Sequence, residues 1–274
     1  MTTGIVLPGV TGRMGKLIAQ QVLSTDETAL LVASARPGSD AVGNDVGLVC
    51  GVDPCGQVVE DDLERGLAAV SAAQLQGAVL IDFTSPAALE THVRVAVRKG
   101  MGLLVGTTGY DAAVAAALDD ASNEIPVLVA SNCAVGPNLL LSLTRLTAAA
   151  RPAADVEIVE LHHRHKRDSP SGTALSLGQA AASARETALE DVLTTCRSGD
   201  RVRRQQEMGI FGVRGGDVTG EHTVYFFLDG ERIELTHRAT DRRIFASGAV
   251  RAARWLGGRP PGRYSMADVL GLPG

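Results

Sequence analysis

Short apolar runs recur along the first half of the chain and are separated by segments with helical periodicity. The apolar runs, each of strand length, lie at residues 4–7, 29–35, 78–83, 102–106 and 126–130. Amphipathic helical segments lie at residues 13–23, 86–99 and 112–123. Strands that alternate with helices predict a parallel sheet with right-handed crossovers, the arrangement of an α/β domain.

The second half of the chain carries a different pattern. Strands are predicted at residues 155–162, 223–228 and 232–237. The dipeptide Asp229-Gly230 predicts a hairpin turn between the last two. Residues 198–220 are rich in Gly, Arg and Gln and predict loops. Together these elements predict an α+β domain with a mixed open sheet.

The end of the chain is helical again, at residues 244–256, and we expect this helix to pack back on the first domain. A chain of 274 residues is long enough for two hydrophobic cores. We therefore predict a Rossmann-like domain with a parallel sheet from residues 1–132 and 242–274. Residues 133–241 are predicted to form the α+β domain.

Composition excludes several classes of protein. The net charge is −5 and 21% of residues are charged, a balance that is atypical of nucleic-acid-binding proteins and of disordered chains. No apolar run approaches the roughly 20 residues needed to cross a membrane, and no signal-peptide pattern is apparent. The four cysteines form no CxxC pair, which favours reduced thiols. We expect a cytoplasmic protein that binds neither nucleic acid nor membranes.

A glycine-rich turn follows the first apolar run and opens the first helical segment. Its residues are Gly9, Val10, Thr11, Gly12, Arg13, Met14 and Gly15, a GxxGxxG variant of the dinucleotide-binding fingerprint. Glycines let the backbone approach a pyrophosphate, and a helix N-terminus favours its negative charge. We expect a dinucleotide phosphate to bind here; the alternative is a tight turn without a ligand.

The second predicted strand ends without the acidic residue that is typical of NAD sites. Asp or Glu at this position accepts hydrogen bonds from ribose hydroxyls, but here the strand ends in Ala35 and Arg36. Arg36 and Arg13 fit a 2′-phosphate better than a free hydroxyl, so we expect NADPH to be used at least as well as NADH. The alternative is that Arg36 only covers the adenine.

Two further segments follow the ends of predicted strands. They are Gly106, Thr107 and Thr108 after the fourth strand, and Ala130, Ser131 and Asn132 after the fifth. Ligands of open parallel sheets lie beyond the carboxyl ends of the strands, so we expect both segments near the nicotinamide half of a dinucleotide. Ordinary loop capping is the alternative.

Residues 160–174 gather proton donors and acceptors on a strand-to-helix connection. If the strand continues, one face carries Glu160, His162, Arg164 and Lys166, and the other carries His163 and His165. Histidine titrates near neutral pH and lysine can act as an acid, so we expect His162 and Lys166 to act on one substrate. The alternatives are a metal site built from the histidines and a solvated basic loop, and His165 in particular is expected to be structural.

A helix-start signature follows these side chains, at Pro170, Ser171, Gly172 and Thr173. Ser or Thr caps such a helix, and its first backbone N–H groups remain available to a ligand. Together with the neighbouring cations, these groups would bind a carboxylate. The segment therefore favours chemistry on an anionic substrate.

Two motifs coincide in one known family. GVTGRMG at residues 9–15 and ELHHRHKRDSPSGTA at residues 160–174 resemble the 4-hydroxy-tetrahydrodipicolinate reductase family, also called dihydrodipicolinate reductase, and the second motif is close to diagnostic. Further matches are IDFT at residues 81–84, GTTG at 106–109, RGGD at 214–217 and GEHT at 220–223. The resemblance covers essentially the whole chain.

The resemblance implies NAD(P)H-dependent reduction of 4-hydroxy-tetrahydrodipicolinate to tetrahydrodipicolinate, with loss of water, in the diaminopimelate route of lysine biosynthesis. It implies that the first domain binds the dinucleotide, and that the second binds the dicarboxylate substrate and builds a homotetramer. Two rivals remain: a non-catalytic NADPH-binding sensor or scaffold, and another small-molecule NAD(P) dehydrogenase. The first would lose the proton donors, and the second would need a nucleophile or a different base.

Matching positions carry the family's residue roles onto this chain. His162 is similar to the proton donor/acceptor and Lys166 to the proton donor. The resemblance implies substrate contacts at His163, Gly172 and Thr173, with Ser171 beside them. It implies cofactor contacts at residues 9–14, Arg36, residues 106–108 and residues 130–133, and no metal ligand. Many members carry Glu or Asp where Ala35 stands, and some carry an aromatic residue where Cys133 stands.

Overall fold

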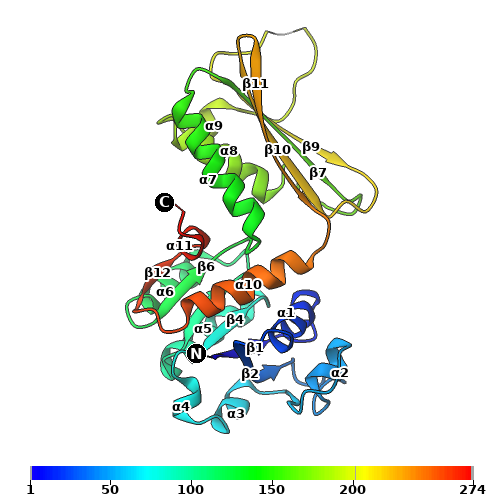
Figure 1. Cartoon of the computed structure of the whole chain (residues 1–274), viewed down its shortest axis with the longest axis vertical. Helices are drawn as coiled ribbons and strands as arrows, with labels where there is room; N and C mark the ends of the chain where they lie inside the picture. Colours follow the sequence, from blue (N-terminus) through cyan, green and yellow to red (C-terminus); the bar gives the residue numbers. More distant parts are fainter. Residues whose placement is uncertain (1, 201, 273–274) are drawn as a thin grey trace. The chain divides into compact units, whose positions relative to one another are not determined.

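The computed structural model describes residues 2–200 and 202–272, which divide into two compact units (Figure 1). Unit 1 comprises residues 2–134 and 245–271, and unit 2 comprises residues 135–244 with residue 272. The chain thus leaves unit 1 after residue 134 and returns to it in helix α10 (Arg243–Leu256). The expectation that this helix packs on the first domain is confirmed, because its buried residues belong to the core of unit 1.

Unit 1 is built on one parallel sheet. Its strands are β1 (Thr3–Pro8), β2 (Thr28–Ser34), β3 (Val59–Glu60), β4 (Val79–Asp82), β5 (Gly102–Val105), β6 (Pro126–Val129) and β12 (Gly262–Tyr264). They lie in the order β12-β6-β5-β4-β1-β2-β3, and every neighbouring pair is parallel, as predicted. The order reverses at β1, which lies between β2 and β4. Such a switch point opens a ligand crevice beyond the carboxyl ends of the strands.

Helices cover both faces of this sheet. They are α1 (Arg13–Leu23), α2 (Val46–Cys50), α3 (Leu63–Ala68), α4 (Ala72–Leu75), α5 (Pro86–Lys99), α6 (Ala112–Ala121), α10 and α11 (Met266–Leu270). Alternation along β1 divides the core: Ile5 and Leu7 join the apolar residues of α1 and α10, whereas Val6 joins those of α5 and α6. Both faces of a central parallel strand are therefore apolar, which explains the continuous apolar runs.

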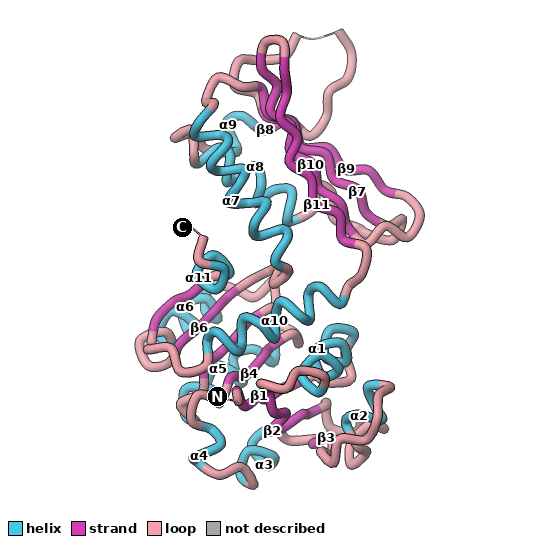
Figure 2. The backbone as a smooth tube through the Cα atoms, in the orientation of Figure 1, coloured by secondary structure: helices cyan, strands magenta, loops and turns pink. Residues whose placement is uncertain are grey.

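Unit 2 is an α+β domain with an open mixed sheet, as predicted (Figure 2). Its strands are β7 (Asp155–His162), β8 (Leu193–Thr194), β9 (Met208–Arg214), β10 (Gly220–Leu228) and β11 (Glu231–Ala239). The order is β11-β10-β7-β9-β8, with β10 antiparallel to both neighbours and β9 parallel to both of its neighbours. Helices α7 (Val135–Ala150), α8 (Gly172–Ser183) and α9 (Leu189–Val192) pack on one face, over Val156, Ile158 and Phe226.

The expectation of loops throughout residues 198–220 is wrong, because β9 lies there beside β7. Its two inner glycines hid it, since glycine disfavours strands. A Cβ atom on Gly209 would lie 1.9 Å from the Glu157 carboxylate, and one on Gly212 would lie 2.3 Å from the Ser169 hydroxyl. Glycine at both positions lets these side chains lie close to the strand, and a larger residue would displace them.

The strand also does not continue through the histidine segment. Strand β7 ends at His162, the His163 N–H donates to the Val218 carbonyl at 2.8 Å, and a turn follows. The shared face of Glu160, His162, Arg164 and Lys166 was expected only if the strand continued; because it ends, Arg164 and Lys166 lie beyond it, and of these four residues Glu160 and His162 share a face of β7. Among the residues that the structure describes, helices are too short or too polar to cross a membrane.

Candidate active site

The glycine turn between β1 and α1 has the geometry of a phosphate site. Gly9 has a φ of +72°, and the N-cap residue of α1 is Gly12, which has no side chain to bond the first N–H groups. A Cβ atom on Gly15 would lie 2.2 Å from the Gly9 carbonyl oxygen, so only glycine lets α1 approach the turn this closely. The N–H groups at the start of α1 fit a dinucleotide pyrophosphate.

The other predicted members of this turn differ in exposure. Val10 is fully buried, and its N–H donates to the Ser34 carbonyl at 3.0 Å, which ties the turn to the end of β2. Thr11 and Met14 are half-buried, and Arg13 is exposed in the first turn of α1. Val10 therefore holds the turn in place, and the others present atoms to the surface.

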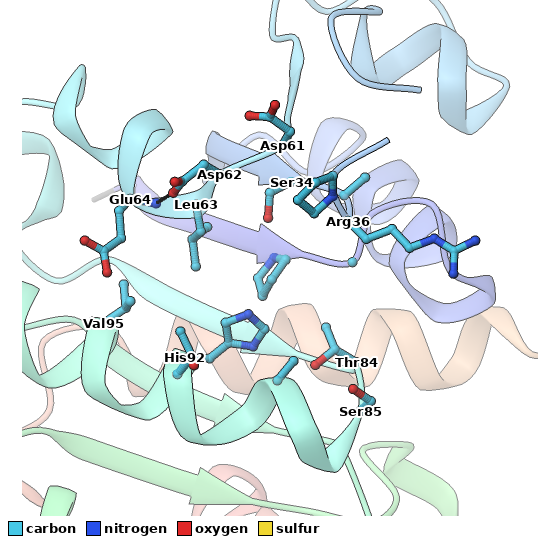
Figure 3. Close-up of a pocket in the computed structure, with 16 residues that line it drawn as sticks. Ser34, Arg36, Asp61, Asp62, Leu63, Glu64, Thr84, Ser85, His92 and Val95 are labelled. Atoms are coloured by element: carbon cyan, nitrogen blue, oxygen red, sulfur yellow. Dashed lines mark hydrogen bonds between the residues drawn. The ribbon is translucent and has the colours of Figure 1, made fainter. Parts of the chain in front are cut away.

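A cavity of about 550 Å³ lies beyond the carboxyl ends of β1, β2 and β4 (Figure 3). Gly9, Ser34, Arg36, Thr84 and His92 line it, and residues 61–64 form part of its wall. Its place beside the glycine turn suits the adenosine half of a dinucleotide. The exposed side chain of Arg36 is available to a phosphate there.

The segment after β5 is tied to the end of β4. Gly106 donates its N–H to the Asp82 carbonyl at 2.8 Å, and the buried Thr107 donates its hydroxyl to the Asp82 carboxylate at 2.5 Å. Thr108 is exposed. The hydroxyl proton of Thr107 is therefore used inside the protein, whereas Thr108 is free to contact a ligand.

The segment after β6 is held from both ends. The Ala130 N–H donates to the Val105 carbonyl at 2.9 Å, and the Asn132 side chain accepts from the Ala134 N–H at 3.0 Å. Ser131 is exposed. Cys133 is buried, and this burial raises the pKa of its thiol to about 12. The protonated thiol is a poor nucleophile, which counts against a dehydrogenase that acts through a covalent cysteine.

In unit 2, Glu160 and His162 lie on one face at the end of β7. The His162 Nδ1 atom lies 2.6 Å from a carboxylate oxygen of the fully buried Glu160. Arg214 stands opposite His162 in β9 and donates to both oxygens of Glu160, at 2.6 and 2.8 Å. Burial alone would raise the pKa of Glu160, but the hydrogen bonds from Arg214 and His162 lower it below its usual value.

An ionised Glu160 fixes the tautomer of His162. Because a carboxylate only accepts, the proton of a neutral His162 lies on Nδ1, and Nε2 keeps a lone pair. Burial lowers the pKa of His162, and the charges of Lys166 and Arg214 lower it further, against the opposing effect of Glu160. At neutral pH the imidazole is thus uncharged and can accept a proton at Nε2.

Helix α8 begins beside this pair. Its N-cap residue Ser171 is buried, donates its N–H to Glu160 at 3.0 Å and accepts from the Ala174 N–H at 3.3 Å. The Ser171 hydroxyl also lies 3.0 Å from Nε2 of the buried His222. The predicted helix start is confirmed. The polar atoms of Ser171 form hydrogen bonds inside the protein. At the start of the helix, Gly172 and Thr173 are therefore the residues that a ligand can contact.

Lys166 and His163 lie in the turn that follows β7. The Lys166 ammonium group lies 2.9 Å from the Asp168 carboxylate, and Nε2 of His163 lies 3.4 Å from the Arg242 guanidinium. Burial lowers the pKa of His163, and the charge of Arg242 lowers it further. The turn therefore adds cations and a neutral imidazole to the pair at the end of β7.

Two side chains of this cluster had no role in the sequence reasoning, Arg214 and His222. Both lie in motifs that the sequence does display, RGGD and GEHT. Their partners could not be named without the register of β9, which pairs Arg214 with His162, and of β10, which pairs His222 with Glu160. Across the described parts of the chain, no three His, Cys, Asp or Glu side chains are grouped to hold a metal ion.

A Rossmann-like sheet with a glycine turn, in one chain with an acid–base cluster on a separate α+β unit, defines the class of NAD(P)-dependent oxidoreductases. Family models narrow the class. Residues 3–133 match the model of the dihydrodipicolinate reductase N-terminus, and residues 136–270 match that of its C-terminus. The chain belongs to the dihydrodipicolinate reductase family.

Individual relatives agree with this assignment. The 4-hydroxy-tetrahydrodipicolinate reductase of Alkalilimnicola ehrlichii is 47% identical over 274 residues, covering 99% of this chain and 100% of the relative. The enzyme of the same name from Myxococcus xanthus is 45% identical over 97% of each chain. Among solved structures, a dipicolinate-bound dihydrodipicolinate reductase from Paenisporosarcina sp. TG-14 shares the fold, with a TM-score of 0.76 at 22% identity over 98% of this chain and 99% of that one.

Proposed function

We propose that the protein reduces 4-hydroxy-tetrahydrodipicolinate to tetrahydrodipicolinate, with loss of water, in the diaminopimelate route of lysine biosynthesis. The hydride donor is NADPH or NADH. The observation that carries this proposal is the set Glu160, His162 and Arg214 beside the start of α8. It occurs in a chain whose full-length relatives bear the name of this enzyme.

The residues of unit 1 fit a nicotinamide dinucleotide, which supplies the hydride when it is bound. Residues 9–14 would hold its pyrophosphate, because the turn offers backbone N–H groups without a covering side chain. Residues 106–108 and 130–133 follow neighbouring strands of the sheet and would orient the nicotinamide half. The cofactor domain accordingly consists of residues 1–132 and 242–274, and the substrate and oligomerisation domain of residues 133–241.

Cofactor preference follows from the end of β2. Arg36 lines the cavity and Ala35 places no carboxylate at the end of β2, whereas the carboxylates of Asp61, Asp62 and Glu64 line another part of its wall. A 2′-phosphate gains a charge-assisted hydrogen bond from Arg36, so NADPH is used at least as well as NADH. Without a carboxylate at residue 35, the 2′-hydroxyl of NADH loses its usual acceptor.

His162 and Lys166 move the protons of the reaction. Loss of water takes one proton from the ring and gives one to the departing hydroxyl, and we assign the first to Nε2 of the neutral His162 and the second to the Lys166 ammonium group. The proton held on His162 then returns to the ring to balance the hydride that the dinucleotide would supply. Glu160, itself bound by Arg214, holds the His162 ring by Nδ1, so that Nε2 stays on the side of the ring away from the carboxylate. A Cβ atom on Gly220 would lie 2.9 Å from this Nε2 atom, so glycine there keeps the approach to the nitrogen open.

The two carboxylates of the substrate bind to the helix start and the turn before it. The first N–H groups of α8, at Gly172 and Thr173, are donors without an intrahelical partner. Ser171 serves this site as the cap that fixes their direction, and His163 adds a contact from the turn. The N-terminus of a helix binds an anion through its N–H groups and dipole alone, and the positive charge of Lys166 strengthens this binding.

We assign the protein to the cytoplasm as a homotetramer built through unit 2. Apolar side chains are exposed at Val213 on β9 and Phe227 on β10, on the face of the sheet away from the helices. An open sheet with exposed apolar residues gains free energy when a second copy covers it. Light scattering after size-exclusion chromatography measures the assembly directly, and a monomer at micromolar concentration would contradict it.

The test of the activity is a coupled assay. Purified protein is mixed with freshly made 4-hydroxy-tetrahydrodipicolinate, and oxidation of NADPH or NADH is followed by absorbance. We expect oxidation only when enzyme and substrate are both present. A protein that binds NADPH but oxidises none in the presence of substrate would be a sensor or scaffold, and the proposal would be wrong.

A further inference from the structure

The Asp82 carboxylate is a buried junction between three elements of unit 1. Asp82 ends β4 and is fully buried. Its oxygens accept hydrogen bonds from the Thr84 N–H at 3.0 Å, the Thr84 hydroxyl at 3.0 Å and the Thr107 hydroxyl at 2.5 Å. His92 Nδ1, on helix α5, binds the same carboxylate. The end of β4, the segment after β5 and α5 therefore meet at one charged group.

This junction fixes the direction of two hydroxyl protons. Burial would raise the pKa of Asp82, but the hydrogen bonds from His92, Thr107 and Thr84 lower it, so the carboxylate is ionised and only accepts. A threonine has one hydroxyl proton, and Thr84 and Thr107 both donate theirs to the Asp82 carboxylate. The Thr107 oxygen also accepts from the Thr84 N–H at 2.9 Å. The lone pairs of the Thr84 oxygen remain for an outside donor.

Thr84 stands where a bound dinucleotide would meet it. Its side chain lines the cavity beside the glycine turn, and Figure 3 shows it on the same wall as His92. A Cβ atom on Gly9 would lie 2.8 Å from the Thr84 methyl carbon, so this side chain lies directly against the turn. The His92 side chain is only 12% exposed, and it also lines the cavity.

We propose that the Thr84 oxygen accepts a hydrogen bond from a ribose hydroxyl of the dinucleotide, and that Asp82 and His92 are positioning residues that hold it in this role. The inference rests on the cofactor binding proposed above. A ribose hydroxyl is a donor, whereas a pyrophosphate at neutral pH carries only acceptors. Thr84 therefore selects the sugar and leaves the phosphates to the helix N-terminus.

The experiment compares variants by cofactor fluorescence titration and by steady-state kinetics. Thr84→Val keeps the methyl contact with Gly9 and removes the oxygen, so we expect Kd and KM for the cofactor to rise about 5-fold while kcat changes less than twofold. Thr84→Ser keeps the oxygen and retains wild-type affinity. The matched control is Thr28→Val, whose hydroxyl donates to the Val22 carbonyl at 2.7 Å in the same unit. It lowers thermal stability and leaves Kd unchanged.

His92 is tested by its Nδ1 donor. His92→Leu removes one donor to the Asp82 carboxylate and raises Kd and KM by a similar factor, whereas His92→Asn places an amide N–H near the same position and restores most of the affinity. If His92→Leu lowers Tm but leaves KM unchanged, His92 is only structural and the inference is overturned. If the wild type binds the dinucleotide and Thr84→Val binds it equally well, the inference also fails. A wild type that binds no dinucleotide contradicts the proposed function instead.

Discussion

Glu160 and His162 lie two residues apart at the end of one strand, with the Glu160 carboxylate 2.6 Å from Nδ1 of His162. Arg214 closes the arrangement from the neighbouring strand by binding both carboxylate oxygens. Glu160 therefore fixes the imidazole of His162, and Arg214 in turn fixes Glu160. This is how an acid–base residue keeps one orientation without contacts to its outer nitrogen.

Replacing Lys166 separates chemistry from cofactor binding. Lys166→Ala removes the proton donor, so we expect kcat to fall by about 10² to 10⁴. The Kd for NADPH stays at the wild-type value, because the predicted cofactor contacts lie in unit 1. Stopped-flow kinetics and fluorescence titration measure the two quantities. Lys99→Ala at the end of α5 is the control, and an unimpaired Lys166→Ala enzyme would end the assignment of Lys166.

Arg214 is expected to matter for stability as well as for rate. Arg214→Met leaves the fully buried Glu160 with fewer donors, and breaking a buried pair in this way costs about 3 kcal/mol. Arg238 pairs with Glu221 in the same sheet, but these side chains are 66% and 30% exposed, so Arg238→Met costs less than about 1 kcal/mol. Urea unfolding followed by circular dichroism compares the two. Equal losses would show that the burial of Glu160 is not decisive.

Stability should fall as the pH is lowered towards 4. Burial, together with the charge of His162, lowers the pKa of His222 to about 4, whereas an unfolded histidine titrates near 6.5. In this window the unfolded chain binds a proton that the native chain does not, so the free energy of unfolding decreases by about 3 kcal/mol from pH 6.5 to 4. The lowered pKa values of Glu160 and Asp82 add a loss only below about pH 4.5.

Unfolding curves at a series of pH values test this dependence. In His222→Gln the side chain no longer titrates, so the slope between pH 6.5 and 4 becomes shallower while the free energy above pH 7 changes less. The amide of glutamine can still bond the Ser171 hydroxyl, which limits the structural damage. If the variant and the wild type have equal slopes, the buried imidazole is not the source.

Arg36 should control the choice between cofactors. Arg36→Met removes the cation that we propose for the 2′-phosphate, so kcat/KM for NADPH falls about 10-fold and that for NADH is unchanged. Arg94 is an exposed cation on α5 that pairs with Glu90, and Arg94→Met serves as the matched control. A wild type with a strong preference for NADH would refute the preference itself, whatever the variants do.

The glycine turn predicts an asymmetry between two of its residues. Gly15→Ala forces a Cβ atom to within 2.2 Å of the Gly9 carbonyl, whereas Gly12→Ala places one at 3.2 Å from the same oxygen. We expect Gly15→Ala to lower Tm and abolish cofactor binding, and Gly12→Ala to weaken binding while most of the stability remains. Thermal melts with and without NADPH measure both effects, and the reverse order would contradict the geometry.

The parallel sheet of unit 1 could be predicted because its strands are buried on both faces and therefore appear as apolar runs. The bounds predicted for residues 13–23 and 86–99 agree with α1 and α5. The histidine segment was recognisable from its chemistry. Strand β9 could not be predicted, because its residues Gly209 and Gly212 make room for side chains from other segments of the chain. The composition of a segment indicates which backbone conformation it prefers, but it does not indicate which side chains of other segments will pack against it.

The junction at Asp82 was equally hidden. Its members come from three segments, and the sequence shows only that IDFT resembles a family motif. Asp82 and His92 meet because ten residues of strand end, turn and helix bring them together, and Thr107 arrives from the next strand. A hydrogen-bond network of this kind depends on tertiary packing, which periodicity does not encode.

The return of the chain to unit 1 through α10 affects how the protein is made. Ala249 and Ala253 of this helix share one apolar cluster with Ile5 and Leu7 of β1. During synthesis on the ribosome, the earliest strand emerges long before the helix that completes its cover. Part of the core of unit 1 therefore stays exposed to water until the roughly one hundred residues of unit 2, which lie between its two segments, have been translated.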